Sequence, residues 1–169
     1  GILKCNGTGF DILWIKQRGF FLSQLGLITS NTTITVGPDT YVHRAYAVGA
    51  GSAGINATRT GAAGGMAWGD IPVNPGDGVV YAIASGVATV TVNGVVMLTG
   101  NPGSGATGGT ASKHASGTNG GANSGGNALA GATGVAGPSS GSPLGPGVDG
   151  AAGRGGAGWG GAGFTGGGG

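Results

Sequence analysis

Residues 101–169 hold 27 of the 45 glycines of this 169-residue chain and only three formally charged side chains, Lys113, Asp149 and Arg154. Glycine loses more backbone entropy on folding than any other residue and brings no side chain to bury. Such a segment is either a disordered tail or is held by backbone hydrogen bonds between closely packed segments. Its larger apolar residues are too few for an ordinary core: Leu129, Val135, Leu144, Val148, Trp159 and Phe164.

Glycine recurs at every third residue in short stretches of this segment, for example at positions 147, 150, 153 and 156. A three-residue period is that of the extended polyproline II helix. Because the register breaks often and proline is sparse, we expect several short polyglycine II-like segments packed side by side rather than collagen. Turns are expected at 137–140 and 143–146. The alternative is a disordered low-complexity tail, which would leave Trp159 and Phe164 in water.

The middle of the chain, residues 31–100, has the pattern of a small β domain. Strands are predicted at 32–36, 41–48, 66–73, 79–84, 87–92 and 95–98 from β-branched runs bounded by turn residues. Asn93-Gly94 between two such runs predicts a type I′ hairpin, because both positions tolerate a positive φ. Residues 49–65 form a glycine-rich loop within this domain. The fold class expected is all-β, with short antiparallel strands in a sandwich-like arrangement followed by the polyglycine II-like region.

The first segment, residues 1–30, is rich in large apolar residues that glycines divide into short pieces. Short apolar runs of this kind favour strands over helices, with a helical turn over 20–27 as the alternative. Several aromatic side chains in so short a stretch indicate a packing surface. We therefore expect residues 1–30 to attach the β domain to a larger assembly or to contact another subunit. Charged residues interrupt the segment, so it does not have the pattern of a signal peptide.

Charge and motif content argue against several classes of function. The net charge is only +2, and Arg18, Arg44, Arg59 and Arg154 are scattered, so no basic stripe for nucleic acid is expected. The single cysteine, Cys5, excludes an intrachain disulfide. No apolar run is long enough for a membrane span. With two histidines and five aspartates the chain has no motif for catalysis or a metal site, and no cofactor is expected.

The order of three sequence pieces resembles the glycine-rich domain of bacteriophage tail fibres and related receptor-binding adhesins. The pieces are Thr33–Pro38 with the glycine block 49–65, the stretch from Gly64 to Asp77 with its Asn-Pro-Gly turn, and Val90–Gly94 with Gly100–Gly103. Together they cover roughly residues 32–169. The chain departs from the family pattern at 87–98, where an additional hairpin precedes the glycine run. Residues 1–30 match nothing in that family.

The resemblance implies a phage or phage-like fibre component, a distal adhesin on the virion that binds a bacterial surface glycan or an outer-membrane protein. Loops on a rigid scaffold are where recognition usually resides. The candidate receptor contacts are the few polar and aromatic residues of the glycine-rich region: Lys113, His114, Arg154, Trp159 and Phe164. For Trp159 and Phe164 the alternative is an interior role between glycine layers. A homo-oligomer or association with other fibre subunits is expected, without nucleic acid.

A second hypothesis is a self-assembling subunit of an extracellular or virion-associated filament. In that case residues 1–30 are a subunit contact and the glycine-rich region is the packed body of the filament. An adhesin predicts a discrete assembly, whereas a filament subunit predicts open head-to-tail contacts. The sequence leaves both alternatives open.

Overall fold

The computed structural model describes residues 27–52, 61–128 and 140–149 in full, and the backbone pairing of four short strands outside these ranges. Within the described residues the chain is all-β, and every strand pair is antiparallel. The part of the chain described contains no helix that is long and apolar enough to cross a membrane. The predicted all-β class is confirmed.

The larger sheet has five strands and contains four of the six strands predicted from the β-branched runs. Its order is β3 (Thr32–Thr35), β6 (Gly78–Ala84), β7 (Val87–Val92), β8 (Val95–Gly100) and β9 (Ala111–Lys113). Both central hairpins turn on two residues with positive φ, as type I′ turns require. Asn93 and Gly94 have φ of 50° and 78°, which confirms the predicted hairpin, and Ser85 and Gly86 have φ of 48° and 78°.

The smaller sheet has three strands in the order β10 (Thr118–Asn123), β5 (Met66–Pro72) and β4 (Val42–Val48). The two strands expected around residues 37–39 both form, but they belong to different sheets, because β3 pairs with β6 and β4 pairs with β5. The chain therefore crosses between the sheets at the Gly37–Thr40 turn. Strands β9 and β10 come from the glycine-rich segment after residue 100, so the sandwich extends into it.

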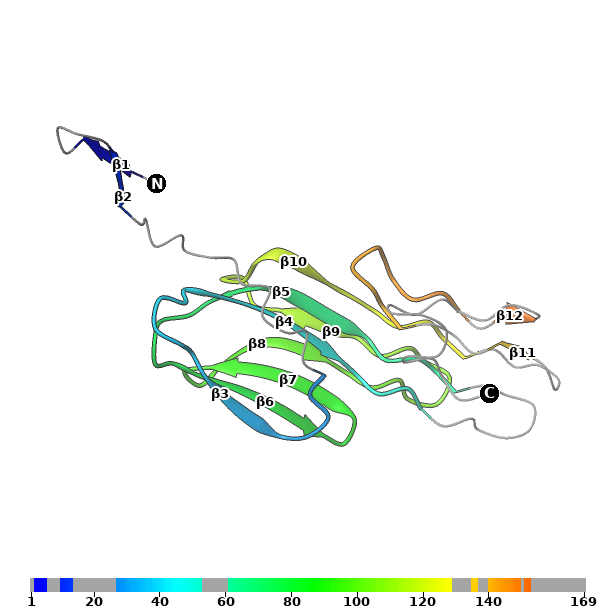
Figure 1. The fold of residues 1–169 in the computed structure, drawn as a ribbon. Helices are drawn as coiled ribbons and strands as arrows, with labels where there is room; N and C mark the ends of the chain where they lie inside the picture. The colour runs from blue at the N-terminus through cyan, green and yellow to red at the C-terminus, as the bar shows by residue number, and fades with distance from the viewer. Residues whose placement is uncertain are drawn as a thin grey trace.

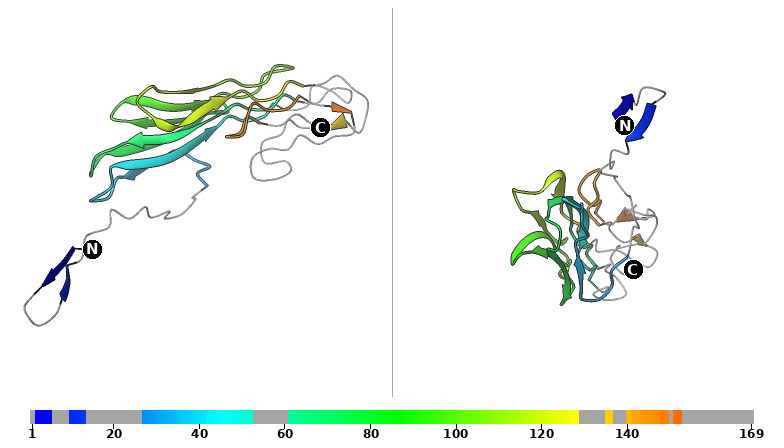
Figure 2. Two further views of the ribbon diagram at one scale, coloured as in Figure 1. Left: turned by 90° about the horizontal axis from the view of Figure 1, so that it is seen from above. Right: turned by 60° about the vertical axis from the view of Figure 1, so that its left-hand side comes forward.

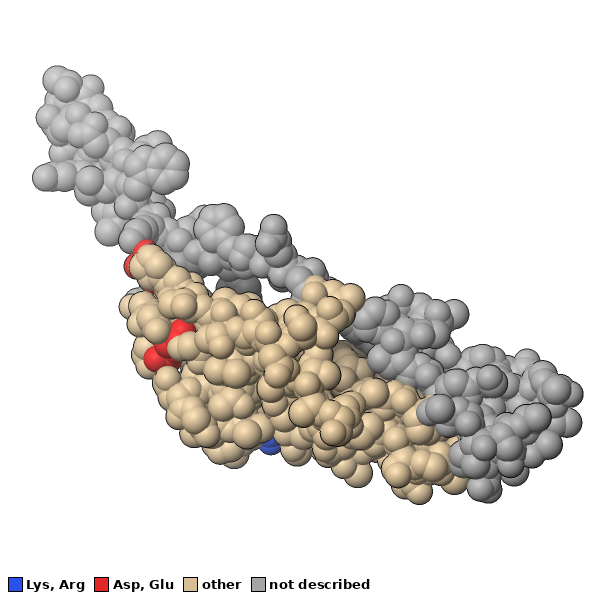
Figure 3. Space-filling model, turned by 90° about the horizontal axis from the view of Figure 1, so that it is seen from below, with Lys and Arg blue, Asp and Glu red and all other residues tan. Residues whose placement is uncertain are grey.

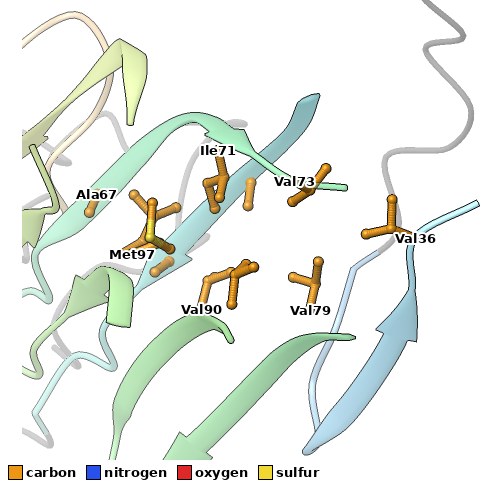
Figure 4. Packing of buried hydrophobic residues seen from close by; sticks show 11 residues of the cluster. Val36, Ala67, Ile71, Val73, Val79, Val90 and Met97 are labelled. Carbon is orange, nitrogen blue, oxygen red and sulfur yellow. The ribbon is translucent and has the colours of Figure 1, made fainter. Parts of the chain in front are cut away.

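The two sheets face each other and enclose one hydrophobic core (Figures 1 and 4). In β4 and β5 every second residue points inward, so Ala45, Ala47, Ala67 and Ile71 face the larger sheet. The larger sheet contributes mostly valine side chains to the core. At a bulge in β8 two consecutive residues, Met97 and Leu98, are both buried. Small alanines on one side and branched residues on the other allow the sheets to pack closely. This core fixes the position of everything attached to the sandwich.

Two further strand pairs lie at the ends of the chain. β1 (Ile2–Cys5) pairs with β2 (Phe10–Leu13), and β11 (Val135–Ala136) pairs with β12 (Ala151–Ala152). Strands in 1–30 agree with the short apolar runs. The helical turn considered for 20–27 falls almost wholly outside the described residues, as do positions 53–60 of the glycine-rich loop and 137–139 of the first expected turn. The second expected turn forms as a tight hairpin between Ser142 and Gly145.

Candidate functional site

Beyond the end of the sandwich, glycine-rich segments run side by side and are joined by backbone hydrogen bonds. We call this the glycine bundle; it comprises residues 49–52, 61–65, 101–110, 124–128, 140–142 and 145–149. It includes both sides of the predicted loop 49–65, which pair through the bonds from Gly49 N–H to Gly65 O (2.9 Å) and from Ser52 N–H to Ala62 O (2.8 Å). Residues far apart in the sequence are therefore brought together by main-chain contacts.

The segment 61–65 lies inside the bundle and bonds to several neighbours at once. The carbonyl oxygens of Ala62, Ala63 and Gly64 accept from Ser52, Gly109 and Gly141, which belong to three different segments. The carbonyl oxygen of Gly65 accepts from Gly49, which belongs to the same segment, 49–52, as the partner of Ala62. Ala62 and Ala63 are completely buried. Successive carbonyls thus point in three directions, with a repeat of three residues.

The bundle has no room for side chains at most of its glycines. A Cβ atom placed on Gly64 would lie 1.9 Å from the carbonyl oxygen of Gly49, and one on Gly109 would lie 2.1 Å from that of Asn101. The same holds, at 2.4 Å or less from a backbone oxygen, for a further set: Gly49, Gly65, Gly103, Gly108, Gly125, Gly126 and Gly141. In each case the obstacle is backbone of another segment. Glycine is required here because neighbouring backbones touch.

Two tight turns of the glycine bundle point in opposite directions. The end remote from the sandwich carries the tight turn Ser104–Thr107, in which each residue donates its N–H to the other's carbonyl at 3.0 Å (Figure 1). The hairpin Ser142–Gly145 points the other way, beside β10, and is tied to it by the side chain of Asn123, which donates to Ser142 O at 2.6 Å. Its tip residue Leu144 is 98% exposed.

The structure describes two of the five predicted receptor contacts, and both lie at the sandwich end opposite the Ser104–Thr107 turn. The ammonium group of Lys113 donates to the carbonyls of Gly117 (2.6 Å) and His114 (3.2 Å), so it holds the β9–β10 connection together. His114 is exposed, and its Nδ1 shares a hydrogen bond with Ser116. The remaining three, Arg154, Trp159 and Phe164, lie outside the described residues. Receptor contact by all five stays a prediction.

A polar cluster on the outer face of the smaller sheet was not predicted. Arg44 on β4 and Asp70 on β5 are paired residues, and the guanidinium donates to both carboxylate oxygens, from Nε at 2.6 Å and from Nη2 at 2.9 Å. Asn119 donates to the same carboxylate at 2.9 Å. The hydrogen bonds from Arg44 lower the pKa of Asp70, and those bonds in turn raise the pKa of Arg44. The Asp70 side chain is covered mainly by these partners, near the surface, while 46% of the Arg44 side chain is exposed.

Replacing Arg44 with methionine is expected to lower the free energy of unfolding by about 2 kcal/mol at pH 7, because a covered carboxylate loses two charge-assisted hydrogen bonds. The loss should shrink as the pH falls below 3.8, since Asp70 contributes stability above that value and loses it as it becomes protonated. Urea unfolding of both proteins between pH 7 and pH 3 measures this. A pH-independent difference would mean that Arg44 acts through packing alone.

Two aromatic residues lie on the same outer face, one pair along the strands from this cluster. Tyr46 on β4 is paired with Trp68 on β5, and both are partly exposed. A Cβ atom on Gly121 of β10 would lie 3.0 Å from the six-membered ring of Trp68, so the indole packs over the bare backbone of that glycine. The two-residue period of a strand places Arg44 and Tyr46 on one face, whereas their partners on β5 depend on the register of the sheet.

On the inner side of the sandwich, His43 of β4 meets Tyr81 of β6 across the gap between the sheets. His43 Nε2 and the Tyr81 hydroxyl share a hydrogen bond, and their rings are in an edge arrangement with centroids 6.0 Å apart. Burial lowers the pKa of His43 and raises the pKa of Tyr81 to about 12. Both groups are therefore neutral at pH 7. The contact is a structural bridge between the two sheets.

The stability of the fold is expected to fall as the pH drops through 6.5 toward the lowered pKa of His43, because the unfolded chain binds the proton more readily. It should also fall as the pH rises from about 10 to about 12, where the unfolded chain ionises Tyr81 first. Urea midpoints across these ranges measure both effects. The acid effect should disappear in His43→Gln and persist in His114→Gln, and its persistence in His43→Gln would contradict the assignment.

Charge is sparse on the described surface. In the view of Figure 3 nearly all of the described surface is uncharged, apart from acidic side chains toward one end and a small basic spot at the lower edge. Among residues 27–52, 61–128 and 140–149, no three of His, Cys, Asp or Glu come together as metal ligands would. The described arrangement thus consists of packed sheets, hydrogen-bonded glycine-rich backbone and one polar-aromatic face.

Comparison with known proteins adds no assignment. No family model, curated protein or solved structure matches this chain.

Proposed function

We propose that this chain is a non-enzymatic component of a phage or phage-like tail fibre, and that its glycine bundle is an array of polyglycine II-like segments. The observation that carries the proposal is the bonding of segment 61–65, whose successive carbonyls accept from three different neighbouring segments. A three-residue repeat with lateral bonds in three directions is what packed threefold extended helices require. A β strand in a sheet would bond to neighbours on two sides only.

Such a bundle is rigid without a hydrophobic interior, and this suits a scaffold that presents loops to a host surface. Its segments are anchored to the sandwich through the ends of β4, β5 and β8, so its position is fixed by the core. The turn Ser104–Thr107 is held at its remote end by backbone bonds. We infer that the chain is a distal adhesin domain of a virion, with a bacterial surface glycan or an outer-membrane protein as its receptor.

Amide hydrogen exchange of the native protein tests the bundle independently of its function. The N–H groups of Gly65, Gly103, Gly109 and Gly125 donate to other segments and should exchange slowly. Gly105, exposed at the tip of the Ser104–Thr107 turn, should exchange fast and provides the internal control. Exchange of all five at the rate of an unfolded peptide would support the disordered-tail alternative instead.

Binding to bacterial cells tests the adhesin. The labelled full-length chain should bind saturably to cells of a susceptible strain, and an excess of unlabelled chain should reduce plaque formation by a phage that uses the same receptor. The variant Gly109→Ala, in which a Cβ would meet the carbonyl of Asn101 at 2.1 Å, should bind less because the scaffold is disrupted. Absence of binding to every strain of a broad panel would count against an adhesin.

The filament subunit is the second candidate, and apolar residues 1–30 are the feature that favours it. It predicts that the purified chain forms uniform filaments of growing length at rising concentration. Negative-stain images of the protein used for the cell assay separate the two proposals. Discrete particles together with cell binding support the adhesin, whereas filaments without cell binding support the structural subunit.

A further inference from the structure

The outer face of the smaller sheet combines aromatic and polar groups in a way that the core does not need. Tyr46 and Trp68 are cross-strand partners, and Arg44 and Asp70 are the next outward-facing pair along the same strands. The alternate residues of these strands, among them Ala45, Ala47 and Ala67, point inward and belong to the core. The four side chains therefore form a strip on the side of β4 and β5 that points away from the larger sheet.

The segment 140–149 runs on the side of the smaller sheet that faces away from the larger sheet (Figure 2, right). The hairpin Ser142–Gly145 is fixed against β10 by the bond from Asn123 to Ser142 O. The floor of the face is thus a sheet, and one of its borders is a hairpin. Both are held by hydrogen bonds before any ligand arrives, which reduces the entropy cost of binding.

We infer that this outer face binds a neutral saccharide, whose pyranose rings stack on Tyr46 and Trp68 while its hydroxyl groups accept hydrogen bonds from Arg44. Aromatic rings provide an apolar surface with a negative face, to which the C–H groups of a sugar ring are attracted. The six-membered ring of Trp68 lies close to Gly121 of the neighbouring strand, which limits the movement of the indole. Rigid aromatic residues lose little conformational entropy on binding.

The charge of the cluster favours a neutral ligand over an anionic one. Arg44 is already paired with Asp70 through two hydrogen bonds, so the pair carries no net charge. The exposed part of the Arg44 guanidinium can donate a hydrogen bond to a sugar hydroxyl group. Because Asp70 already neutralises the guanidinium, this binding does not require the desolvation of an unpaired charge. Asn119 secures the carboxylate from the other side, which fixes the direction of the guanidinium. The Arg44–Asp70 pair therefore holds the N–H donors of Arg44 in a fixed direction but does not attract an anionic ligand.

This inference rests on the proposed adhesin function, because it gives the receptor a chemical class and places its site. It differs from the predicted contacts at Lys113, the last residue of β9, and His114, which begins the β9–β10 connection. Tyr41 supplies a matched control: it is an exposed tyrosine just before β4 and has the opposite alternation from Tyr46. Removing the two tyrosines separately thus compares the same chemical change on and off the face.

The experiment uses the full chain with Trp68→Phe as the reference, so that the difference in fluorescence between the two reports Trp68 among the three tryptophans. It is titrated with cellohexaose, maltohexaose, a galactotetraose and, as the acidic probe, a tetramer of galacturonic acid. At least one neutral sugar should change the emission saturably and protect Trp68 from quenching by acrylamide. Calorimetry should show binding weakened about tenfold by Tyr46→Ala and unchanged by Tyr41→Ala.

Three results would overturn the inference: no response to any neutral sugar, equal loss of affinity in Tyr41→Ala, or binding of the acidic tetramer alone. If Tyr46→Ala fails to fold, protection of Trp68 from acrylamide by the sugar in the chain that retains Tyr46 still tests whether the sugar binds at this face. Cell binding distinguishes this failure from that of the adhesin. If the Tyr46→Ala chain binds cells as well as the parent does, the adhesin function is supported but this site is not its receptor site. If the chain binds sugar but not cells, the saccharide site is supported but the adhesin function is not.

Discussion

Replacing Gly109 with alanine is expected to lower the free energy of unfolding by about 3 kcal/mol or more, although it adds only one methyl group. The new Cβ would lie 2.1 Å from the carbonyl oxygen of Asn101 and 2.8 Å from the N–H nitrogen of Gly65. Neither obstacle is a side chain that could rotate away. The segments would have to separate, and this would break the bonds from Gly109 to Ala63 and from Gly125 to Gly109.

Gly37→Ala is the matched control for this experiment. Gly37 lies in an exposed turn, and the nearest atom to its new Cβ would be the Thr40 hydroxyl oxygen at 3.8 Å, which is an ordinary contact. The substitution should leave stability within about 0.5 kcal/mol. Urea unfolding monitored by circular dichroism and by tryptophan fluorescence measures both variants. Equal stabilities for the two would show that the glycine bundle is not packed as described.

Replacing Leu98 with alanine is expected to cost about 3 kcal/mol, because it removes a buried side chain and leaves a cavity between the sheets. Leu98 is 1% exposed and is paired with Val90 of β7, which is also buried. Ala45, Ala47 and Ala67, on the facing strands β4 and β5, are too small to fill the space. A loss of this size is a large fraction of the stability of an ordinary domain.

Leu144→Ala is the control for the same chemical change on the surface. Leu144 is 98% exposed at the tip of the Ser142–Gly145 hairpin, so its removal should change the urea midpoint little. A loss comparable to that of Leu98→Ala would mean that Leu144 is covered in solution, for example by a second copy of the chain. Measuring the midpoint at two protein concentrations distinguishes such an association from a direct effect on folding.

The strands could be predicted from the sequence because their signals are local. Runs such as Thr32–Val36 and Val87–Val92 consist mostly of β-branched residues, and turns of the sheet contain residues that accept a positive φ. The pairing of the strands was harder to predict from the sequence than the strands themselves. The Gly37–Thr40 turn joins two sheets rather than two neighbouring strands, and only the common core of both sheets decides this.

The candidate binding face shows the same division. Alternation along β4 places Arg44 and Tyr46 on one side, and this follows from the period of a strand alone. Asp70 and Trp68 become their partners through the register of β4 and β5, and Asn119 arrives from β10, some 49 residues from Asp70 along the chain. No local pattern connects these residues, so the sequence could supply the side chains but not the site.

The sequence by itself determined that this chain is built from short β-strands and glycine-rich segments with almost no charge, because both features follow from local preferences and composition. Only the tertiary structure decided where the glycines are indispensable. Gly64, Gly109 and Gly125 are separated along the chain, yet each touches the backbone of another segment where a methyl group would not fit. The physical reason is that close approach is a property of two backbones at once, and one position in a sequence carries information about only one of them.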